Sequence, residues 1–548
     1  MNTNWVARRD THRDLSDVIS DLAGCSVNEL LRPTDTDAGE IENMTEAAER
    51  IRQAINDGED IHIFGDYDAD GVSSVAILYL LITYLKEKAG TKDSGVVNIR
   101  VPKRMSEGYG LSEAAIDEFD KGLLITVDNG ITALAAVKKA RDKGLFVIVL
   151  DHHLPAEEGL PVANIIVDPH VHPDKNGYEE FCGAGLSFKL AKYFLTESEE
   201  KDLLDKLCAV ATVGTVADQM PLTGANRVIV EDGLGFMNEK KMTQGLKSLI
   251  EACEFTKINE VDVGFKIAPI LNAAGRMLDD GGKYAAGCLA QDNKPTPTLV
   301  KKLIEINENR KALVDETLKS VQEQIGENPA FPIVAHVPQL HPGIVGIVAG
   351  KIMEQYHCPV YLFTGEGNLG GSARSQIPNF NLHEFTASHS SLLISFGGHC
   401  NAVGLQIKEE NLEKFREAVQ RDFHEMDIQV DDNIYYDIEL KPDQILGCIG
   451  EQEKFGPFGA GVPKPTVLVR NVPCVTGKGG QHYARMGSDK RHVKMFGRGY
   501  ILLAWNMGDK YEEMGKPRNV DVIGTLNLSD SKYGRQMQFM VTDFTPAS

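Results

Sequence analysis

The sequence predicts an α/β protein with a parallel sheet in its first half, a long connecting helix, a second α/β domain and a C-terminal β-barrel. Three observations support this fold class. Short apolar runs alternate with helix-like stretches between residues 60 and 170, a polar helical segment fills residues 296–326, and short strand-like segments with glycine turns follow the second α/β region. Alternating strands and helices are typical of βαβ units that bury a parallel sheet.

Length and composition indicate several domains and no membrane span. The chain has 548 residues, 42% of them hydrophobic and 25% charged. This length exceeds one hydrophobic core, so we expect about three domains. No window approaches the roughly 18 consecutive apolar residues of a membrane helix, and residues 1–17 lack the apolar stretch of a secretory signal. Nine dispersed cysteines without a CxxC pair suit a reducing compartment, so we expect a cytoplasmic protein.

The net charge of −22 argues against a protein that coats duplex DNA through bulk electrostatics. The window 464–498 departs from this average, because it holds eight Lys or Arg residues and a single acid, Asp489. Such a run is most often a solvated face, and the other interpretation is a local surface for a polyanion. The basic residues are Lys464, Arg470, Lys478, Arg485, Lys490, Arg491, Lys494 and Arg498.

Five apolar runs in the first half predict the strands of the parallel sheet. Helix-like stretches at 72–90, 112–122 and 132–144 separate them. Four of the runs end in aspartate, and ligands of an open parallel sheet bind outside the carboxyl ends of its strands. We therefore expect Asp66, Asp128, Asp151 and Asp168 to converge on one crevice. The five runs are 61–66, 96–102, 122–128, 145–151 and 164–168.

The rest of the chain changes character twice. A mostly helical stretch runs from about 183 to 325 and ends in the polar helix, whose thin apolar stripe is typical of an exposed connection. A second α/β module begins near 331, and the final segment, up to 544, alternates apolar residues around a glycine turn, as small β-barrels do. The predicted domain limits are 1–45, 46–295, 296–328, 329–428 and 429–548.

Aspartate and histidine at strand ends are the composition of a site for Mg²⁺ or Mn²⁺. For a single aspartate the alternative is a helix N-cap or a turn, but several in one βαβ series favour metal binding. Two cations about 3.5–4 Å apart promote displacement at phosphorus. Alternation leaves open whether Asp70 meets a cation or braces the turn, and packing is the favoured explanation for His62. The candidate ligands are Asp66, Asp68, Asp128, His152, His153 and Asp218.

Several motifs in this order resemble those of the DHH phosphoesterase superfamily. The first four are FGDYDADGVSS, TVDNGIT, LDHHLP and GTVADQMPL. Further segments resemble the RecJ family with its DHHA1 domain: VPKRMSEGYGL, APILNAAGRM, LHPGIVGIVAGKI, GSARS, FGGHCNAVG and FGPFGAGVPKP. The resemblance covers nearly all of the chain after about residue 45 and includes an OB-fold after the DHHA1 domain.

The resemblance implies a role for each motif residue. Asp66, Asp68, Asp128, His152 and Asp218 would bind two divalent cations, Mn²⁺ or Mg²⁺. The catalytic group would be His152 with His153, which would lie near the scissile phosphate, and Asp151, which would orient both histidines. The substrate-binding residues would be Arg104, Arg276, Ser372, Arg374, Ser375, Gly397, Gly398 and His399.

These residue types in the substrate-binding motifs are suited to binding phosphate. Arginine offers a bidentate fork to a terminal phosphate, and glycine turns let backbone N–H groups approach one. In the C-terminal region an OB-fold would bind single strands through a cationic groove and stacked aromatic rings. Tyr483, Phe496, Tyr500 and Trp505 are available there, although aromatic residues at strand spacing are more often part of a core.

We therefore predict a metal-dependent 5′-to-3′ exonuclease for single-stranded DNA that releases 5′-mononucleotides in DNA repair and recombination. Polarity and DNA preference follow from the resemblance, whereas the acid cluster alone predicts phosphoester hydrolysis. The alternatives are an oligoribonuclease or cyclic-dinucleotide phosphodiesterase of the same superfamily, a non-catalytic scaffold and a generic phosphatase. Family behaviour leads us to expect a monomer that works with a helicase and a single-strand-binding protein, away from membranes.

Overall fold

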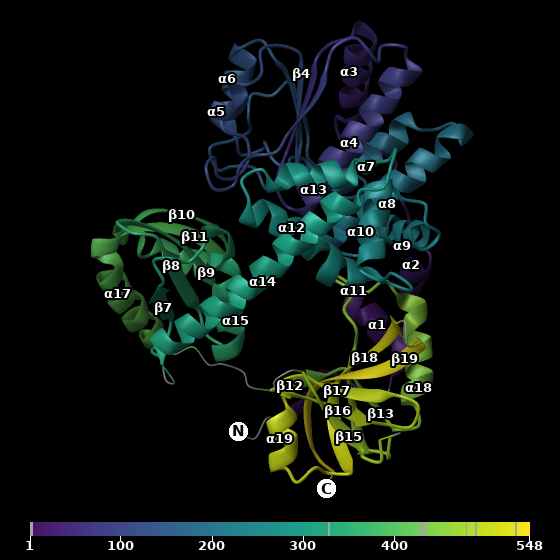
Figure 1. Ribbon diagram of the computed structural model, residues 1–548, viewed down its shortest axis with the longest axis vertical. Helices are drawn as coiled ribbons and strands as arrows, with labels where there is room; N and C mark the ends of the chain where they lie inside the picture. Colours follow the sequence, from purple (N-terminus) through teal and green to yellow (C-terminus); the bar gives the residue numbers. More distant parts are fainter. Residues whose placement is uncertain are drawn as a thin grey trace.

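The computed structural model describes residues 4–11, 13–326, 329–426, 428, 433–477, 479–487, 490–531 and 534–547. Figure 1 shows three lobes, and both chain ends lie at the lowest of them. Each lobe is built on one large sheet: a five-stranded sheet in the first domain, another in the second domain and a seven-stranded sheet in the C-terminal domain.

The first domain is built on the predicted parallel sheet, with strand order β3-β2-β4-β5-β6 and every neighbouring pair parallel. The three inner strands β2, β4 and β5 are buried on both faces, which explains their continuous apolar runs. The strands are β2 (Ile61–Gly65), β3 (Val97–Arg100), β4 (Leu123–Val127), β5 (Phe146–Leu150) and β6 (Ile165–Val167). The surrounding helices are α3 (Met44–Asp57), α4 (Ala69–Lys88), α5 (Glu113–Ile116) and α6 (Leu134–Asp142).

The helix expected over 112–122 is much shorter than predicted. It is capped by Ser112, whose hydroxyl accepts from the Ala115 N–H, and it ends at Ile116. Tight turns that bond residues three apart then carry the chain to the buried Phe119. Packing of Ile116 and Phe119 in the same core cluster therefore replaces the remaining helical turns.

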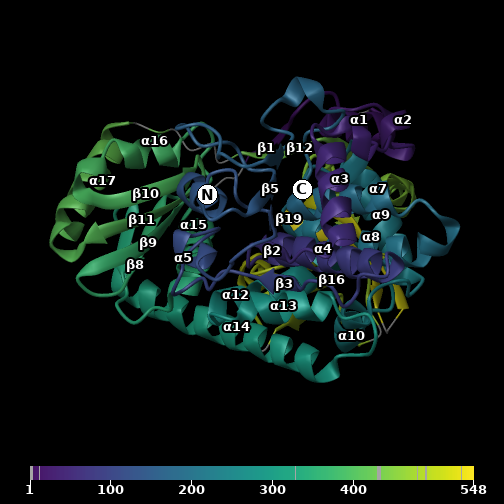
Figure 2. The same cartoon turned by 90° about the horizontal axis from the view of Figure 1, so that it is seen from above.

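A helical block completes the first domain and leads into the connecting helix α14 (Pro297–Ile325). Figure 2 shows α14 running along one side of the molecule from this block to the second domain. Buried residues such as Val300 and Val321 fall near opposite ends of α14, so the helix packs on both domains. The block comprises α7 (Gly183–Phe194), α8 (Lys201–Ala217), α9 (Gly224–Asn238), α10 (Gln244–Ala252), α11 (Glu260–Asp262), the π-helical turn η4 (Val263–Ile267), α12 (Ala268–Met277) and α13 (Gly281–Leu289).

The second domain has a mixed sheet of order β10-β11-β9-β8-β7, in which only β7 and β8 pair in parallel among the described strands. Its strands are β7 (Ile333–His336), β8 (Val360–Thr364), β9 (Asn368–Arg374), β10 (Leu393–His399) and β11 (Ala402–Lys408). Its helices are α15 (Val345–Tyr356), which follows the short turn η5 (Pro342–Ile344), α16 (Leu382–Ala387) and α17 (Leu412–Glu425).

The C-terminal domain, where the β-barrel was predicted, holds a mixed sheet of order β13-β14-β18-β19-β17-β16-β15. The strands are β13 (Ile438–Leu440), β14 (Thr466–Pro473), β15 (Tyr483–Met486), β16 (His492–Phe496), β17 (Ile501–Ala504), β18 (Asn519–Ser531) and β19 (Gly534–Pro546). Two helices accompany them, α18 (Ile445–Gln452) and α19 (Gly508–Glu513).

The N-terminal segment packs on the C-terminal domain. Strand β1 (Trp5–Ala7) pairs in parallel with β12 (Ile434–Tyr436), and α1 (Leu15–Ala23) and α2 (Val27–Leu31) join the C-terminal core. The fully buried Arg227 on α9 fastens this assembly to the first domain, since its guanidinium donates to the carbonyls of Leu30 and of residues 455–457.

Among the described residues, α4 is the single helix whose length and composition would let it cross a membrane. In this protein 72% of its apolar window is buried, against the first sheet and the helices α7 and α8. Its apolar surface is therefore accounted for by the core of the first domain.

Candidate metal and phosphate site

The aspartate-rich loop after β2 begins the site. Asp68 is the N-cap of α4, and its carboxylate accepts 3.0 Å hydrogen bonds from the backbone N–H groups of Asp70 and Gly71. Gly71 is required there, because a Cβ would lie 2.6 Å from the Asp66 carbonyl oxygen. Asp66 is buried, and its Oδ1 has no hydrogen-bond partner among the described residues.

Asp70 turns away from its own loop and contacts α7. Its Oδ2 accepts from the Gly183 N–H at 2.7 Å, and its Oδ1 accepts from the Ala184 N–H at 2.9 Å. The contact depends on glycine, since a Cβ on Gly183 would lie 2.7 Å from the Asp128 Cβ. Asp70 thus braces a distant helix rather than its own turn, although its carboxylate stays 3.9 Å from His152 Nε2.

Asp128 and His152 link the ends of β4 and β5. His152 Nε2 lies 3.1 Å from Asp128 Oδ1 and 3.7 Å from Asp218 Oδ2. Asp218 is the C-cap residue of α8. Asp128 adopts a left-handed backbone with φ of 59°, a conformation that Asp tolerates better than most residues. This turn directs its carboxylate back across the strand ends toward the histidine.

Asp151 organises the second histidine. The Oδ1 of this buried carboxylate contacts His153 Nδ1 at 2.8 Å and accepts from the His152 N–H at 2.8 Å, while Oδ2 accepts from Ile131 N–H. Burial alone would lower the pKa of His153, but the hydrogen bond and charge of Asp151 outweigh it and raise the pKa to about 9. Tyr109 was not singled out from the sequence, yet its hydroxyl lies 3.3 Å from His153 Nε2.

The donor atoms form three overlapping groups, each with its ligand atoms within 4.8 Å of one another. Asp128 is shared by two groups and His152 by two, so the groups make one continuous cluster. Asp168, the fourth aspartate at a strand end, lies outside these groups, and its Oδ1 instead accepts from the His170 N–H. The groups are Asp66, Asp68 and Asp128; Asp128, Asp151, His152 and His153; and Asp70, His152 and Asp218.

The electrostatics of this cluster fit divalent cations. Burial and neighbouring carboxylates raise the pKa values of Asp66 and Asp128 well above their ordinary range, and raise that of Asp218 to about 8. Crowded, buried carboxylates are unfavourable as anions unless positive charge compensates them. Carboxylate oxygens together with an imidazole are the donor set expected for Mn²⁺ or Mg²⁺. The buried Asp66 Oδ1, which has no hydrogen-bond partner among the described residues, is free to bind such a cation.

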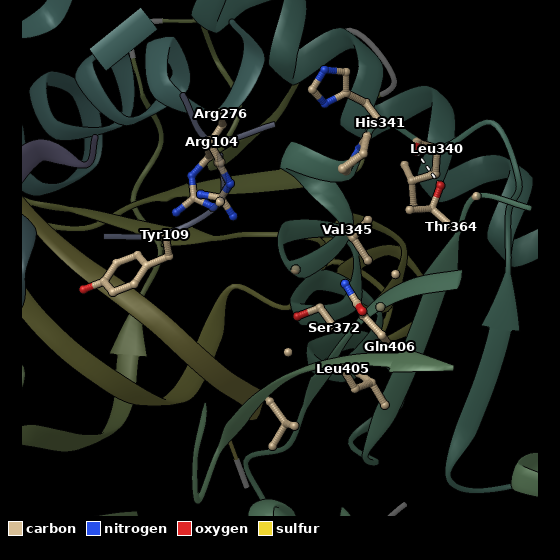
Figure 3. A pocket seen from close by; sticks show the side chains of 18 of the residues that line it. Arg104, Tyr109, Arg276, Leu340, His341, Val345, Thr364, Ser372, Leu405 and Gln406 are labelled. Atoms are coloured by element: carbon tan, nitrogen blue, oxygen red, sulfur yellow. Dashed lines mark hydrogen bonds between the residues drawn. The ribbon is translucent and has the colours of Figure 1, made fainter. Parts of the chain in front are cut away.

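A cleft of about 1320 Å³ adjoins the cluster and is lined by both α/β domains. Tyr67 and Tyr109 form its wall on the metal side, and Arg104, Arg276 and Arg374 enter it from three different segments. In Figure 3 the guanidinium groups of Arg104 and Arg276 lie together at one side of the cleft. Across the described part of the chain, none of the three arginines forms an ion pair with a carboxylate.

Arg104 lies close enough to repel both of the other guanidinium groups. Burial and the charge of Arg104 lower the pKa values of both Arg276 and Arg374. Arg104 stacks its guanidinium 4.8 Å from the Tyr67 ring centroid, and Arg374 donates to the Ser372 hydroxyl at 2.6 Å. Three guanidinium groups around one space favour an anion with several acceptor oxygens.

The second domain lines the cleft with several glycines and with a histidine for which no role was predicted. Gly397 and Gly404 face each other across β10 and β11, and a Cβ on Gly397 would meet no atom within 4 Å, so backbone is open to the cleft. His341 also lines the cleft; its Nδ1 accepts from the Gly343 N–H at 3.1 Å. That bond leaves the proton on Nε2, which makes the ring a donor. In sequence, His341 stands in the family-like segment LHPGIVGIVAGKI, but no role was predicted for it.

The remaining substrate-binding candidates lie away from the cleft lining. Ser375 is buried, and its hydroxyl accepts from the Ile377 N–H. Gly398 and His399 form the exposed end of the β10–β11 hairpin, where Gly398 needs its φ of 144° because a Cβ would lie 2.2 Å from the Ala402 carbonyl. His62 is also remote from the cluster, since it packs on Phe119.

Much of the C-terminal basic segment is committed to contacts within the fold. Arg470 pairs with Glu439 and Asp521, and Arg485 pairs with Asp509 and Glu512. Lys478 and Asp489 lie outside the described residues. Of the four aromatic candidates, Tyr500 is part of the core, whereas the Trp505 ring is 47% exposed and sits 4.8 Å from His492.

Family models match each domain in turn. The DHH family N-terminal domain matches residues 60–215, the DHHA1 domain matches residues 332–425 and the RecJ OB domain matches residues 436–543. These matches fall on the three large sheets, so the seven-stranded C-terminal sheet corresponds to the predicted OB-fold.

Curated relatives and solved structures agree with these models. The single-stranded-DNA-specific exonuclease RecJ of Dickeya dadantii is 31% identical, over 92% of this chain and 90% of its own length. The RecJ of Bacillus subtilis is 33% identical over 92% of this chain, which spans 64% of that relative's length. The RecJ structure of Thermus thermophilus in complex with Mn²⁺ has a TM-score of 0.79 at 27% identity and covers 100% of this chain and 80% of that one; its Mg²⁺ complex has a TM-score of 0.74. The chain therefore belongs to the RecJ family of DHH phosphoesterases.

Proposed function

We propose that the protein is a metal-dependent exonuclease that degrades single-stranded DNA from its 5′ end and releases 5′-mononucleotides in DNA repair and recombination. One observation carries this proposal: a cleft with three arginines that have no acid partner opens beside a cluster of carboxylates and histidines. A terminal phosphate held by the arginines would place the next phosphodiester near the cluster. The printed names of the RecJ relatives support the same substrate.

The metal ligands in this proposal are Asp66, Asp68, Asp128, His152 and Asp218. Two divalent cations bound there would supply an activated water and charge stabilisation at phosphorus. Asp70 stabilises the site from behind, because both of its oxygens accept backbone N–H groups of α7. Asp151 keeps His153 protonated at neutral pH, so that Nε2–H can donate to a phosphate oxygen on the Tyr109 side of the cluster.

Arg104, Arg276 and Arg374 would bind the terminal phosphate, together with the Ser372 hydroxyl and the Nε2–H of His341. The open backbone at Gly397 would let the strand lie against the sheet of the second domain. Gly398, His399 and Ser375 would shape the hairpin and its base, since the first two are exposed at its tip and the third is buried below it. The proposed domain limits remain 1–45, 46–295, 296–328, 329–428 and 429–548.

The test uses three substrates with Mn²⁺: a linear 5′-phosphorylated single strand, a circular single strand and a dinucleotide. An exonuclease is expected to degrade the linear strand to mononucleotides, leave the circle intact and hydrolyse the dinucleotide more slowly. Cleavage of the circle would contradict an exonuclease. Faster turnover of the dinucleotide would favour the oligoribonuclease or cyclic-dinucleotide alternative, against which the RecJ OB domain at residues 436–543 argues.

The finer expectations about context belong to the same proposal. We propose a monomer that acts in the cytoplasm, with a helicase that supplies single strands and a single-strand-binding protein as partners. A complete donor cluster argues against the scaffold alternative, because a scaffold has no need to retain every ligand. Sedimentation of the purified protein tests the monomer, which a mass twice that of the 60.1 kDa chain would contradict.

A further inference from the structure

A second cavity, of about 310 Å³, lies between the first domain and the C-terminal domain. Its volume and mostly apolar lining are those of a small-ligand site. One wall is the end of α8 and the turn after it, and the opposite wall is α11 with the π-helical turn η4. The loop 458–460 of the C-terminal domain forms the rest of the lining. Figure 1 places α11 between the helices of the first domain and the C-terminal sheet.

Phe265 is the unusual residue of this cavity. It lies on η4 and is 82% exposed, the largest exposed fraction among the large hydrophobic residues that the structure describes. Short π-helical turns are uncommon and occur often at functional sites. The η4 turn packs on α8, where Gly264 lies next to Val216. Phe265 thus presents an aromatic face to solvent from a π-helical turn that packs on α8.

The cavity and the donor cluster are built on the same segment at the end of α8. Ala217 and Gln219 line it, and they flank Asp218, whose carboxylate lies 3.7 Å from His152 Nε2. Gln219 has a φ of 55°, so the chain reverses direction at this point. On the far side, the Leu222 N–H donates to the Ala460 carbonyl at 2.8 Å, which fixes the loop from the C-terminal domain to the wall.

We infer that this cavity binds a nucleobase of the substrate single strand, stacked on Phe265, between the C-terminal domain and the metal cluster. The inference rests on the proposed function and adds a base-binding subsite to it. The charge of the lining selects the base rather than the phosphate: Glu260 lies in the wall and accepts from the Phe458 N–H, so a phosphate would be repelled. An acidic peptide would be repelled for the same reason. An uncharged aromatic ring meets Phe265 and the Gln219 amide without that penalty.

The experiment is an abasic scan with 5′-phosphorylated 20-mers, each lacking one base at successive positions from the 5′ end. We expect one position, or two adjacent ones, at which the missing base lowers kcat/KM of the wild type about tenfold. Phe265→Ala should lower kcat/KM on the intact strand by the same factor and should show no further loss at that position. Phe265→Tyr should behave as the wild type, and Phe265→Leu, which keeps an apolar side chain without an aromatic face, should behave as Phe265→Ala.

Two controls separate this inference from the proposed function. Hydrolysis of bis(p-nitrophenyl) phosphate reads the metal cluster alone and should be unchanged in Phe265→Ala, and the preference for a 5′-phosphate over a 5′-hydroxyl should also be unchanged. An abasic penalty that is equal in the wild type and in Phe265→Ala at every position would overturn the inference. So would full activity of Phe265→Ala on every DNA, which would point to a protein partner, or slower hydrolysis of the small ester, which would assign the ring a structural role. A wild type that never shortens strands from the 5′ end would instead refute the proposed function.

Discussion

The carboxylate of Asp70 accepts a 2.7 Å hydrogen bond from the backbone N–H of Gly183, at the first turn of α7. This contact joins the aspartate-rich loop to a helix more than a hundred residues later in the chain. With the parallel bond to Ala184, it satisfies two N–H groups that an uncapped helix terminus would leave buried without a partner. The metal cluster and the helical block are therefore one structural unit.

Replacing Asp70 should expose the cost of those two buried donors. Asp70→Ala and Asp70→Asn both remove the charge, but the asparagine oxygen can still accept one bond. We expect the free energy of unfolding of Asp70→Ala to lie about 2 kcal/mol below that of Asp70→Asn, measured by urea denaturation without metal. Equal stabilities of the two variants would show that Asp70 acts through its charge alone.

Asp128 is expected to be needed for activity and dispensable for folding. Asp128→Asn keeps the left-handed backbone at φ of 59° and the hydrogen-bond acceptor for His152, but it loses the charge that holds a cation. Turnover should fall at least about a thousandfold, while the circular dichroism spectrum stays unchanged and the rise in Tm on adding Mn²⁺ disappears. The remote variant His62→Asn serves as the control and should retain turnover, and substantial activity in Asp128→Asn would contradict the ligand assignment.

Metal removal should make stability depend on pH in a predictable direction. The pKa of Asp218 is raised from 3.8 to about 8, mainly by burial and then by Asp70 and Asp68, and those of Asp66 and Asp128 are raised too. A native state with raised carboxyl pKa values holds protons that the unfolded chain has released, so its stability falls as pH rises from about 4 to 8. Bound cations compensate the same charges.

We therefore expect the gain in Tm from Mn²⁺ to be larger at pH 8 than at pH 6. Differential scanning calorimetry with Mn²⁺ or with EDTA at both pH values measures it. The Asp128→Asn variant should show a weaker pH dependence in EDTA, since one like charge is gone. A gain in Tm that is the same at both pH values would argue against carboxylates with raised pKa values in the metal-free protein.

His341 should contribute to recognition of the terminal phosphate. Burial and the charge of Arg104 lower its pKa, so the ring is neutral at pH 7, and the bond from Gly343 N–H to Nδ1 leaves Nε2 as a donor. Asparagine can replace the Nδ1 acceptor but lacks the Nε2–H. His341→Asn should lower kcat/KM about tenfold on 5′-phosphorylated strands, the loss of one hydrogen bond to a charged group, and leave 5′-hydroxyl strands unaffected. A loss shared by both substrates would mean that His341 only supports the fold of η5.

The strands that carry the site, and the aspartates that follow them, could be predicted from the local pattern of apolar residues. Strands β2, β4 and β5 end within a residue of their predicted limits, because a buried parallel strand is a continuous apolar run. The aspartates that follow them were predictable for the same reason, since the carboxyl ends of parallel strands share one edge. Asp168 is not part of the donor groups, because its strand β6 is at the edge of that sheet, next to β5 alone.

Contacts between distant segments could not be predicted from the pattern. The partners of Asp70 and the hydroxyl of Tyr109 beside His153 depend on packing of whole elements. The same holds for β1, whose strand partner β12 lies at the other end of the chain. The motif around Ser372 and Arg374 places both residues in the lining of the cleft, but Ser375, which follows the strand, is buried, and motif reading does not register this difference.

The most direct test of the proposed function is digestion of one single strand that carries different labels at its two ends, with Mn²⁺ and with samples taken at the earliest times. The proposed function predicts that the 5′ label is released first, as a mononucleotide, while the 3′ label stays on strands that shorten by one nucleotide at a time. Equal early release of both labels, or release of the 3′ label first, would contradict it.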